Sequence, residues 1–255
     1  GNTITSTSTY GGYAAIHLVS SNQSQRITKN KISGIVGTGI YMEDCSGFNT
    51  VPGIVANNFI QCADSAGISI INGFYQDVVY NSVNMTGANA STSALSIYGS
   101  GSGNIIKNNN LVNTAGGYSY VVGAPADTSI ASSDHNNLHF TGTNIGRFNG
   151  ANVISLAAWV VASQSDTNSV NLDPGYLSVS DLHATASALD NLGTPRGNVG
   201  DDIDGTLRNV TTPDIGADEF SGVNRDLGVI AILSPVNNSC GSGATLVKVI
   251  ISNFG

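Results

Sequence analysis

The amino-acid sequence predicts an all-β fold, a parallel β-helix with a C-terminal cap, and three observations support this prediction. Charged residues make up only 10% of the 255 residues, whereas about 25% is usual in soluble domains. Gly and Asn are abundant, with 31 and 29 residues, and such a composition favours turns and strands over helices. Two short patterns also recur along the first half of the chain with one shared period.

The first pattern has the form apolar-x-x-Asn-x-apolar and occurs four times. Its asparagines lie 27, 24 and 28 residues apart, at Asn30, Asn57, Asn81 and Asn109. The second pattern, apolar-x-apolar, alternates with the first. Its first members lie 24, 28, 27 and 23 residues apart, at Ile16, Ile40, Ile68, Leu95 and Tyr118.

Strand geometry explains why both patterns share a period. Apolar residues that alternate with polar ones indicate short strands with one buried face. A repeat of this length cannot fold alone, but it becomes stable when successive coils stack at the strand spacing of about 4.8 Å. We therefore expect Ile16, Ile40, Ile68 and Leu95 to form one interior row, and the four asparagines to link coil to coil at a bend.

The second half of the chain predicts a cap rather than further regular coils. Residues 155–162 form the best helix candidate, because they are Ala-rich and follow a possible N-cap at Ser155. They include Trp159, the only tryptophan. Residues 181–183 and 187–193 are typical of short capped turns. Since the last coil of a solenoid exposes an apolar cross-section, we expect Trp159 to help cover it.

These patterns divide the chain into three parts. Residues 1–123 are expected to form the coils, and residues 124–220 the C-terminal coils and cap. Residues 221–255 are expected to be a linker and the first strands of an incomplete immunoglobulin-like module, because 226–235 and 244–255 alternate like strands. About 30 residues are too few for such a sandwich of about 100 residues.

Several segments of the chain carry a family resemblance. The coil pattern resembles the right-handed parallel β-helix of pectate-lyase-like proteins. The run through 180–183, 190–195, 202–208 and the stretch DIGADEF at 214–220 is similar to the C-terminal segment of large secreted β-helix proteins of Bacteroidota-type bacteria. The resemblance covers roughly residues 10–220, and it implies right-handed coils, export and a multidomain parent. It implies no substrate.

The densest group of acidic residues lies between 201 and 219. Because Ca²⁺ takes six to eight oxygen ligands, Asp201, Asp202 and Asp204 around a Gly turn are candidates for a structural calcium site. The Asp-x-Asp-Gly piece lacks the remaining positions of an EF-hand loop. The alternative is that these acids cap turns and pair with Arg208 in the cap.

A catalytic site is not evident in the coils. A polysaccharide lyase needs a base beside a cation that offsets the substrate's carboxylate, and Lys29, Lys31 and Lys107 form no compact cluster with acids. A glycoside hydrolase needs two carboxylates about 5–10 Å apart. The candidate carboxylates in the coils are Glu43 and Asp44, with Asp64 or Asp77.

Other residues are candidates for contacts and modification. Tyr80 and Tyr98 are candidates for the outer face, where they could stack on sugar rings. Asp64-Ser65-Ala66 matches a short sequon that makes Ser65 a possible O-glycosylation site. The remaining candidates are expected to be structural: the scattered histidines His17, His135, His139 and His183, and the cysteines Cys45, Cys62 and Cys240.

Charge and hydropathy limit the partners. A net charge of −8 disfavours nucleic acid, and no apolar stretch approaches the roughly 20 residues of a membrane span. The chain begins at Gly1 without the pattern of a signal peptide, which suggests a processed or internal piece. We expect an extracellular or cell-surface protein that acts as a non-catalytic rigid stalk or as an adhesive, glycan-binding module. The alternatives are a polysaccharide-active enzyme and a filament subunit that self-associates through its C-terminal strands.

Overall fold

The computed structural model describes residues 1–7, 14–123, 129–221, 227–234 and 246–253. It is an all-β structure whose parallel sheets stack as a β-solenoid of about five turns, so the predicted fold class is confirmed. The chain divides into two compact units, Gly1–Phe220 and Ser221–Gly255, and each is described by itself. Cys240 lies outside the described residues.

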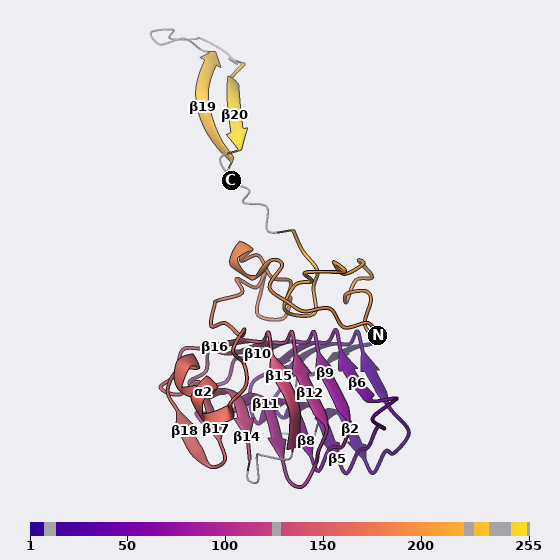
Figure 1. Cartoon of the computed structure of the whole chain (residues 1–255). Coiled ribbons are helices and arrows are strands. Elements are labelled where there is room, and N and C mark those ends of the chain that lie inside the picture. Colours follow the sequence, from indigo (N-terminus) through magenta and orange to yellow (C-terminus); the bar gives the residue numbers. More distant parts are fainter. Residues whose placement is uncertain (8–13, 124–128, 222–226, 235–245, 254–255) are drawn as a thin grey trace. The chain divides into compact units, whose positions relative to one another are not determined.

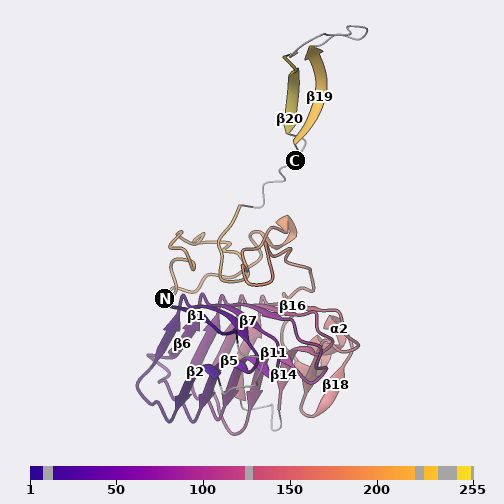
Figure 2. The ribbon, with the colours of Figure 1, turned by 180° about the vertical axis from the view of Figure 1, so that it is seen from behind.

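Each turn of the solenoid adds one strand to each of three sheets (Figures 1 and 2). Sheet A has six strands, in spatial order β1 (Thr3–Thr5), β4 (Lys31–Ile35), β7 (Phe59–Cys62), β10 (Ser82–Met85), β13 (Asn110–Asn113) and β16 (Asn137–Phe140). Sheet C has five strands, β3 (Arg26–Thr28), β6 (Gly53–Ala56), β9 (Gln76–Val79), β12 (Asn104–Lys107) and β15 (Ile130–Asp134).

Sheet B has seven strands and ends in an antiparallel pair. In spatial order they are β2 (Ala14–Val19), β5 (Thr38–Glu43), β8 (Ala66–Ile71), β11 (Ser93–Tyr98), β14 (Tyr118–Val122), β17 (Gly146–Phe148) and β18 (Ala151–Val153). The pairing of β17 with β18 is antiparallel. Because β18 runs against the other strands, the regular coils stop at this edge.

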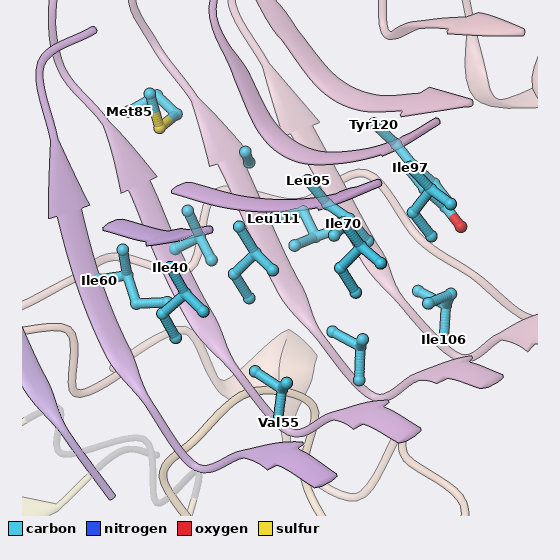
Figure 3. Packing of buried hydrophobic residues seen from close by; sticks show 14 of the residues in the cluster. Ile40, Val55, Ile60, Ile70, Met85, Leu95, Ile97, Ile106, Leu111 and Tyr120 are labelled. Atoms are coloured by element: carbon cyan, nitrogen blue, oxygen red, sulfur yellow. The ribbon is translucent and has the colours of Figure 1, made fainter. Parts of the chain in front are cut away.

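The interior row on sheet B follows the predicted register through four coils. Ile16 pairs with Ile40, Ile40 with Ile68, and Ile68 with Leu95. Ile40, Ile68 and Leu95 are completely buried in the main core cluster, and Figure 3 shows Ile40 and Leu95 within it. The last first member of the pattern, Tyr118, does not continue this row, because Leu95 pairs with Tyr120. A shift of two residues leaves the alternation unchanged, so periodicity alone could not distinguish these two tyrosines.

The asparagine ladder is present, but one of its predicted members was wrong. The side chain of Asn30 donates to Asn58 Oδ1 (2.9 Å), not to Asn57. Asn58 in turn donates to Asn81 Oδ1 (2.9 Å), and Asn81 to Asn109 Oδ1 (3.0 Å). Two adjacent asparagines in this coil made the register ambiguous in the sequence. The true ladder also extends to both sides, from Asn2 to Asn136.

From Asn30 to Asn136, the residue before each ladder asparagine turns the backbone between sheets C and A. These residues adopt φ angles of 53° to 59°, in the left-handed region: Lys29, Asn57, Tyr80, Asn108 and His135. Asparagine tolerates this conformation better than most residues, whereas a bulky side chain pays a steric cost there. Because all five side chains emerge at one edge, the fold places them in one line.

The predicted capping helix is confirmed. Helix α2 spans Leu156–Ser163, and the side chain of Ser155 accepts a hydrogen bond from the backbone of Ala158. Trp159 is 1% exposed and packs on Tyr120 and Phe148, with ring centroids 4.9 and 5.7 Å apart. Its Nε1 donates to Asp166 (2.9 Å). The helix therefore covers the apolar end of the last coil.

Residues 164–220, called the strap here, pair with the last coil at their start and then run along the outside of the coils (Figures 1 and 2). The strap is irregular apart from one short 3₁₀ turn, η1 (Ser187–Leu189). It starts at the last coil, where Val170 pairs with Asn137, and reaches the first coils, where Asp201 meets Lys29. The cap expected for this region thus extends along the outer faces of sheets A and C.

The second unit contains one antiparallel hairpin, β19 (Leu227–Ser234) and β20 (Lys248–Asn253). Both predicted C-terminal strands therefore form, although part of each predicted segment lies outside the described residues. Many of their apolar side chains are exposed, among them Val229, Ile232 and Ile251.

Candidate functional site

The strap is joined to the coils by ion pairs. Lys29 Nζ lies 2.7 Å from Asp201, and Lys31 Nζ lies 3.0 Å from Asp204. In the opposite sense, coil residue Asp77 accepts from strap residue Arg196 at 2.6 Å. Two of the three lysines that were considered as catalytic bases, Lys29 and Lys31, therefore have carboxylate partners in the strap.

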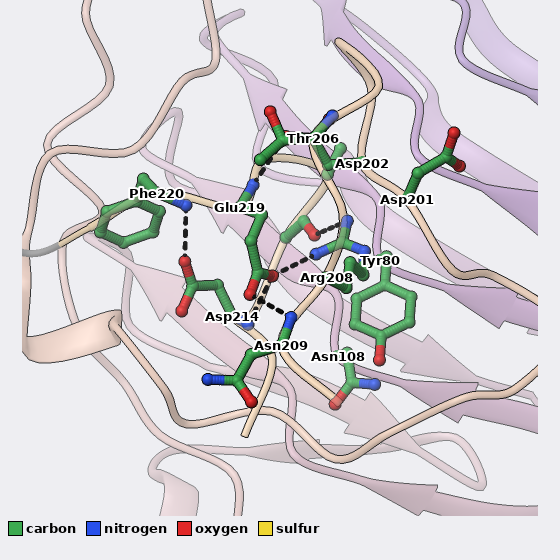
Figure 4. A network of polar contacts seen from close by, with 12 residues as sticks. Tyr80, Asn108, Asp201, Asp202, Thr206, Arg208, Asn209, Asp214, Glu219 and Phe220 are labelled. Carbon is green, nitrogen blue, oxygen red and sulfur yellow. Dashed lines mark hydrogen bonds and ion pairs between the residues drawn. The ribbon is translucent and has the colours of Figure 1, made fainter. Parts of the chain in front are cut away.

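A buried arginine lies at the centre of the polar network between strap and coils (Figure 4). The side chain of Arg208 is 3% exposed, and its Nη1 lies 3.1 Å from Glu219. Its Nη2 donates to Asn57 Oδ1 (2.8 Å), and the guanidinium lies 3.9 Å from the ring centroid of Tyr80. Burial lowers the pKa of Arg208. Asn57 and Tyr80 are two of the aligned bend residues, so this arginine joins the strap to two coils.

Two buried carboxylates shape the strap itself. Asp202 accepts from the backbone amides of Asp204 (2.9 Å), Thr206 (2.8 Å) and Glu219 (3.0 Å). Asp214 accepts from the backbone amides of Asn191 (2.6 Å) and Phe220 (2.7 Å) (Figure 4). Burial raises the pKa of Asp214 to about 7. These acids act as turn caps, as the alternative to a calcium site predicted.

The three predicted calcium ligands are not brought together. Asp202 is occupied by backbone amides, whereas Asp201 and Asp204 bind different lysines. Within the described residues, one group of at least three potential ligands converges instead: His183, Asp204 and Asp218, with one ligand atom of each lying within 4.8 Å of the others. We call these three residues the His183 cluster.

Neighbouring side chains fix the orientation of His183. Its Nδ1 contacts Asp181, and its Nε2 lies 2.5 Å from Asp204 Oδ2. The edge of the ring meets Phe59 of β7, with centroids 4.8 Å apart at an interplanar angle of 87°. Burial alone would lower the pKa of His183, but the hydrogen bonds to Asp204 and Asp181 raise it overall. The hydrogen bond from His183 lowers the pKa of Asp204.

The residues predicted to lie on the surface differ in their exposure. Tyr80 is completely buried and donates to Thr194 O (2.8 Å), so the expectation that it meets a glycan is corrected: the strap covers it. Tyr98 is 42% exposed on β11. Ser65 is exposed, and its hydroxyl accepts from Thr38 (3.0 Å); its glycosylation stays a prediction. Cys45 and Cys62 are buried free thiols.

The carboxylates considered for glycoside hydrolysis each have another partner. Asp44 accepts from the side-chain amide of Asn72 (2.9 Å), and Asp64 from that of Asn89 (2.9 Å). Glu43 accepts from the Tyr41 hydroxyl (3.0 Å). The sequence reasoning did not single out His183 and Asp218 as ligands. Their only sequence signal is proximity to acids at 181 and 219, because no regular spacing links residues of an irregular segment.

The comparisons with known proteins identify no relative. No family model matches the chain, and no curated protein or solved structure matches it significantly. In the described part of the chain, no helix is long and apolar enough to cross a membrane.

Proposed function

We propose that this chain is a non-catalytic, extracellular β-helix, a rigid stalk or adhesive module that binds a glycan through the outer face of sheet B. One observation carries the proposal. The strap packs on the outer faces of sheets A and C, whereas no hydrogen bond of the described residues joins it to a strand of sheet B. Sheet B is therefore the long face that the strap leaves available.

Two rows of residues that alternate with the interior row run along this face. The first pairs His17 with Tyr41, Tyr41 with Ser69, and Ser69 with Ser96; Ser69 and Ser96 are buried, so His17 and Tyr41 are its accessible members. The second contains Glu43, Ile71 and Tyr98 in the same order of strands. Hydroxyls, an imidazole and aromatic rings can donate and accept hydrogen bonds and stack on apolar faces, and sugars offer both kinds of contact.

The aromatic residues are spaced for a polymer rather than a single sugar. Tyr41 and Tyr98 lie on β5 and β11, which are separated by one strand, so they are about 10 Å apart along the solenoid axis. Tyr98 is 42% exposed, and His17 meets the Tyr41 ring edge-on at 4.9 Å. A repetitive surface of this kind suits an extended ligand.

The charges of the coils favour binding over catalysis. Catalytic acids and bases must reach the proton that they transfer, and the candidates here are engaged: Lys29 and Lys31 with strap carboxylates, and Asp77 with Arg196 (2.6 Å). The proposal includes the finer resemblance to pectate-lyase-like, secreted proteins of Bacteroidota-type bacteria. That resemblance is supported by the coil pattern and the DIGADEF stretch.

Affinity electrophoresis of the whole chain against neutral and acidic polysaccharides tests the proposal. We expect retardation by at least one polymer and its loss in Tyr98→Ala. Phe48→Ala is the matched control, because Phe48 is an aromatic residue 58% exposed that lies outside the strands of sheet B. Release of shorter or unsaturated products from any polymer would refute the non-catalytic role. If the Tyr98→Ala variant is retarded as strongly as the unmodified chain, sheet B is not the binding surface.

A second candidate, a filament subunit, is favoured by the hairpin β19–β20. Its strands expose apolar side chains, including Val229 (59%) and Ile232 (64%). An isolated two-stranded hairpin is marginally stable, and free edges recruit further strands. Sedimentation velocity separates the two candidates: concentration-dependent polymers would support the filament, and a monomer at all concentrations would exclude it.

A further inference from the structure

We propose that the His183 cluster binds a divalent transition-metal ion such as Zn²⁺, with His183 Nε2 and one carboxylate oxygen each of Asp204 and Asp218 as ligands. The site lies between strap and sheet A, away from the glycan surface proposed on sheet B, so the two proposals stand independently. One ligand atom of each residue already lies within 4.8 Å of the other two. Only small side-chain movements are needed to surround an ion.

The first supporting feature is the orientation of the imidazole. A histidine that binds a metal almost always donates its other ring N–H to a carboxylate, a backbone carbonyl or water, which fixes its tautomer. Here Asp181 holds Nδ1, and Nε2 faces Asp204. The edge of the ring also meets Phe59, so its position is restricted from a third side. Nε2 is therefore held ready for a ligand.

The second supporting feature is the carboxylate of Asp218. This residue is 9% exposed, and its carboxylate is hydrogen-bonded to the backbone of Ala184. Within the described residues, no lysine, arginine or histidine nitrogen lies within 4 Å of the carboxylate. A buried carboxylate without a close cation is costly. An ion that bridges Asp218 to His183 and Asp204 would supply the missing charge.

The third feature is the neighbouring Lys31. Its Nζ lies 3.0 Å from Asp204 Oδ1, whereas the other oxygen, Oδ2, faces His183. Asp204 can thus bind a metal through Oδ2 while Oδ1 keeps the lysine. The same lysine competes for the carboxylate, so it should weaken the metal site without closing it.

The ligand types select the ion. Imidazole nitrogen with two carboxylates suits Zn²⁺ and its neighbours in the transition series, whereas Ca²⁺ prefers six to eight oxygens. Three protein ligands leave the fourth position of a tetrahedral site to water. Because the ligands come from separate turns of the strap, at 183, 204 and 218, the ion would tie these turns together above Phe59.

Isothermal titration of the chelator-treated whole chain with ZnCl₂ tests the site. We expect one saturable site, with a visible ligand-field spectrum when Co²⁺ replaces Zn²⁺. His183→Gln and Asp218→Asn should abolish binding, and Asp181→Asn, which changes only the support of the imidazole, should weaken it about 10–100-fold. His139→Gln is the matched control, because His139 lies on β16, its Nδ1 contacts Asn171 Oδ1 (3.2 Å), and it is not part of the His183 cluster.

A variant with tighter Zn²⁺ binding provides a test that misfolding cannot mimic, because a misfolded protein would lose affinity. Lys31→Met removes the competing cation and should tighten Zn²⁺ binding several-fold; unchanged affinity would mean that the ion does not reach Asp204. The proposal fails if His183→Gln, folded by circular dichroism, binds Zn²⁺ as tightly as the unmodified chain. It also fails if Ca²⁺ binds equally well in both proteins, because that result would indicate a site made of carboxylates alone.

Discussion

The asparagine ladder offers the sharpest test of how the coils are held together, and Asn81 lies in the middle of it. Asn81 Oδ1 accepts from the backbone N–H (3.2 Å) and the side-chain amide (2.9 Å) of Asn58. Its Nδ2 donates to Val55 O (2.8 Å) and to Asn109 Oδ1 (3.0 Å). Asn81 is completely buried, so water cannot replace these partners.

The substitution Asn81→Ala removes the side-chain amide and takes one hydrogen-bond partner from five groups: the backbone N–H and side-chain amide of Asn58, the carbonyls of Val55 and Val79, and Asn109 Oδ1. The side-chain amide of Asn58 and the Oδ1 of Asn109 each keep another partner. Each buried polar group that loses its partner costs about 1–3 kcal/mol. Some relaxation of the coils will recover part of that cost. We therefore expect the free energy of unfolding to fall by roughly 3–5 kcal/mol.

Urea-induced unfolding, followed by far-UV circular dichroism and by Trp159 fluorescence, measures this loss. The two probes report on the sheets as a whole and on the capped end. Asn171→Ala is the matched control, because Asn171 is exposed and its side chain contacts His139; its cost should stay within about 0.5 kcal/mol. If both variants lose equally little stability, the ladder does not hold the coils together.

Three further predictions concern the core, the covered tyrosine and the hairpin. Ile68→Asp places a charge at a completely buried position and should prevent folding; a native circular dichroism spectrum would contradict the interior row. Burial raises the pKa of Tyr80 to about 12, so the folded chain holds this proton more tightly than the unfolded chain and loses stability as the pH rises above 10. Tyr80→Phe should lose about 1 kcal/mol at pH 7 with the bond to Thr194, and its stability should fall less steeply between pH 10 and 11.5 in urea titrations. In hydrogen exchange of a dilute monomer, Val247–Ile251 should show weak protection; strong protection without assembly would contradict the view that the hairpin needs a partner.

Periodicity predicted the coils because their residues obey a geometric rule. Ile40, Ile68 and Leu95 repeat at nearly constant spacing and face one interior, so the pattern could be found without a structure. Its errors were of register. Asn57 and Asn58 are adjacent, and Tyr118 and Tyr120 share the same alternation, so local pattern could not choose between them. In the folded coils, Asn58 is the ladder residue because its side chain hydrogen-bonds to the asparagine of the neighbouring coil. Tyr120 is the interior tyrosine, and its ring packs on Trp159.

The strap shows why the candidate metal site escaped prediction. His183, Asp204 and Asp218 lie in a segment with no repeat, and their approach depends on turns held by buried carboxylates such as Asp202. The composition predicted acids that cap turns, which the structure contains. It could not predict which acids remain for an ion, because that depends on which backbone amides each carboxylate reaches.

The distribution of amides and charges also accounts for the low charge of the chain. A ladder position needs donors and acceptors at once, because the peptide groups of the coils on either side present both. Asparagine supplies both without a net charge, whereas aspartate would supply only acceptors and add a buried negative charge. Ion pairs occur where the strap meets the coils, as in Arg196 with Asp77 or Lys29 with Asp201. There each cation meets an anion from a different part of the chain, so the pairs specify where the strap lies while the amides specify how the coils stack.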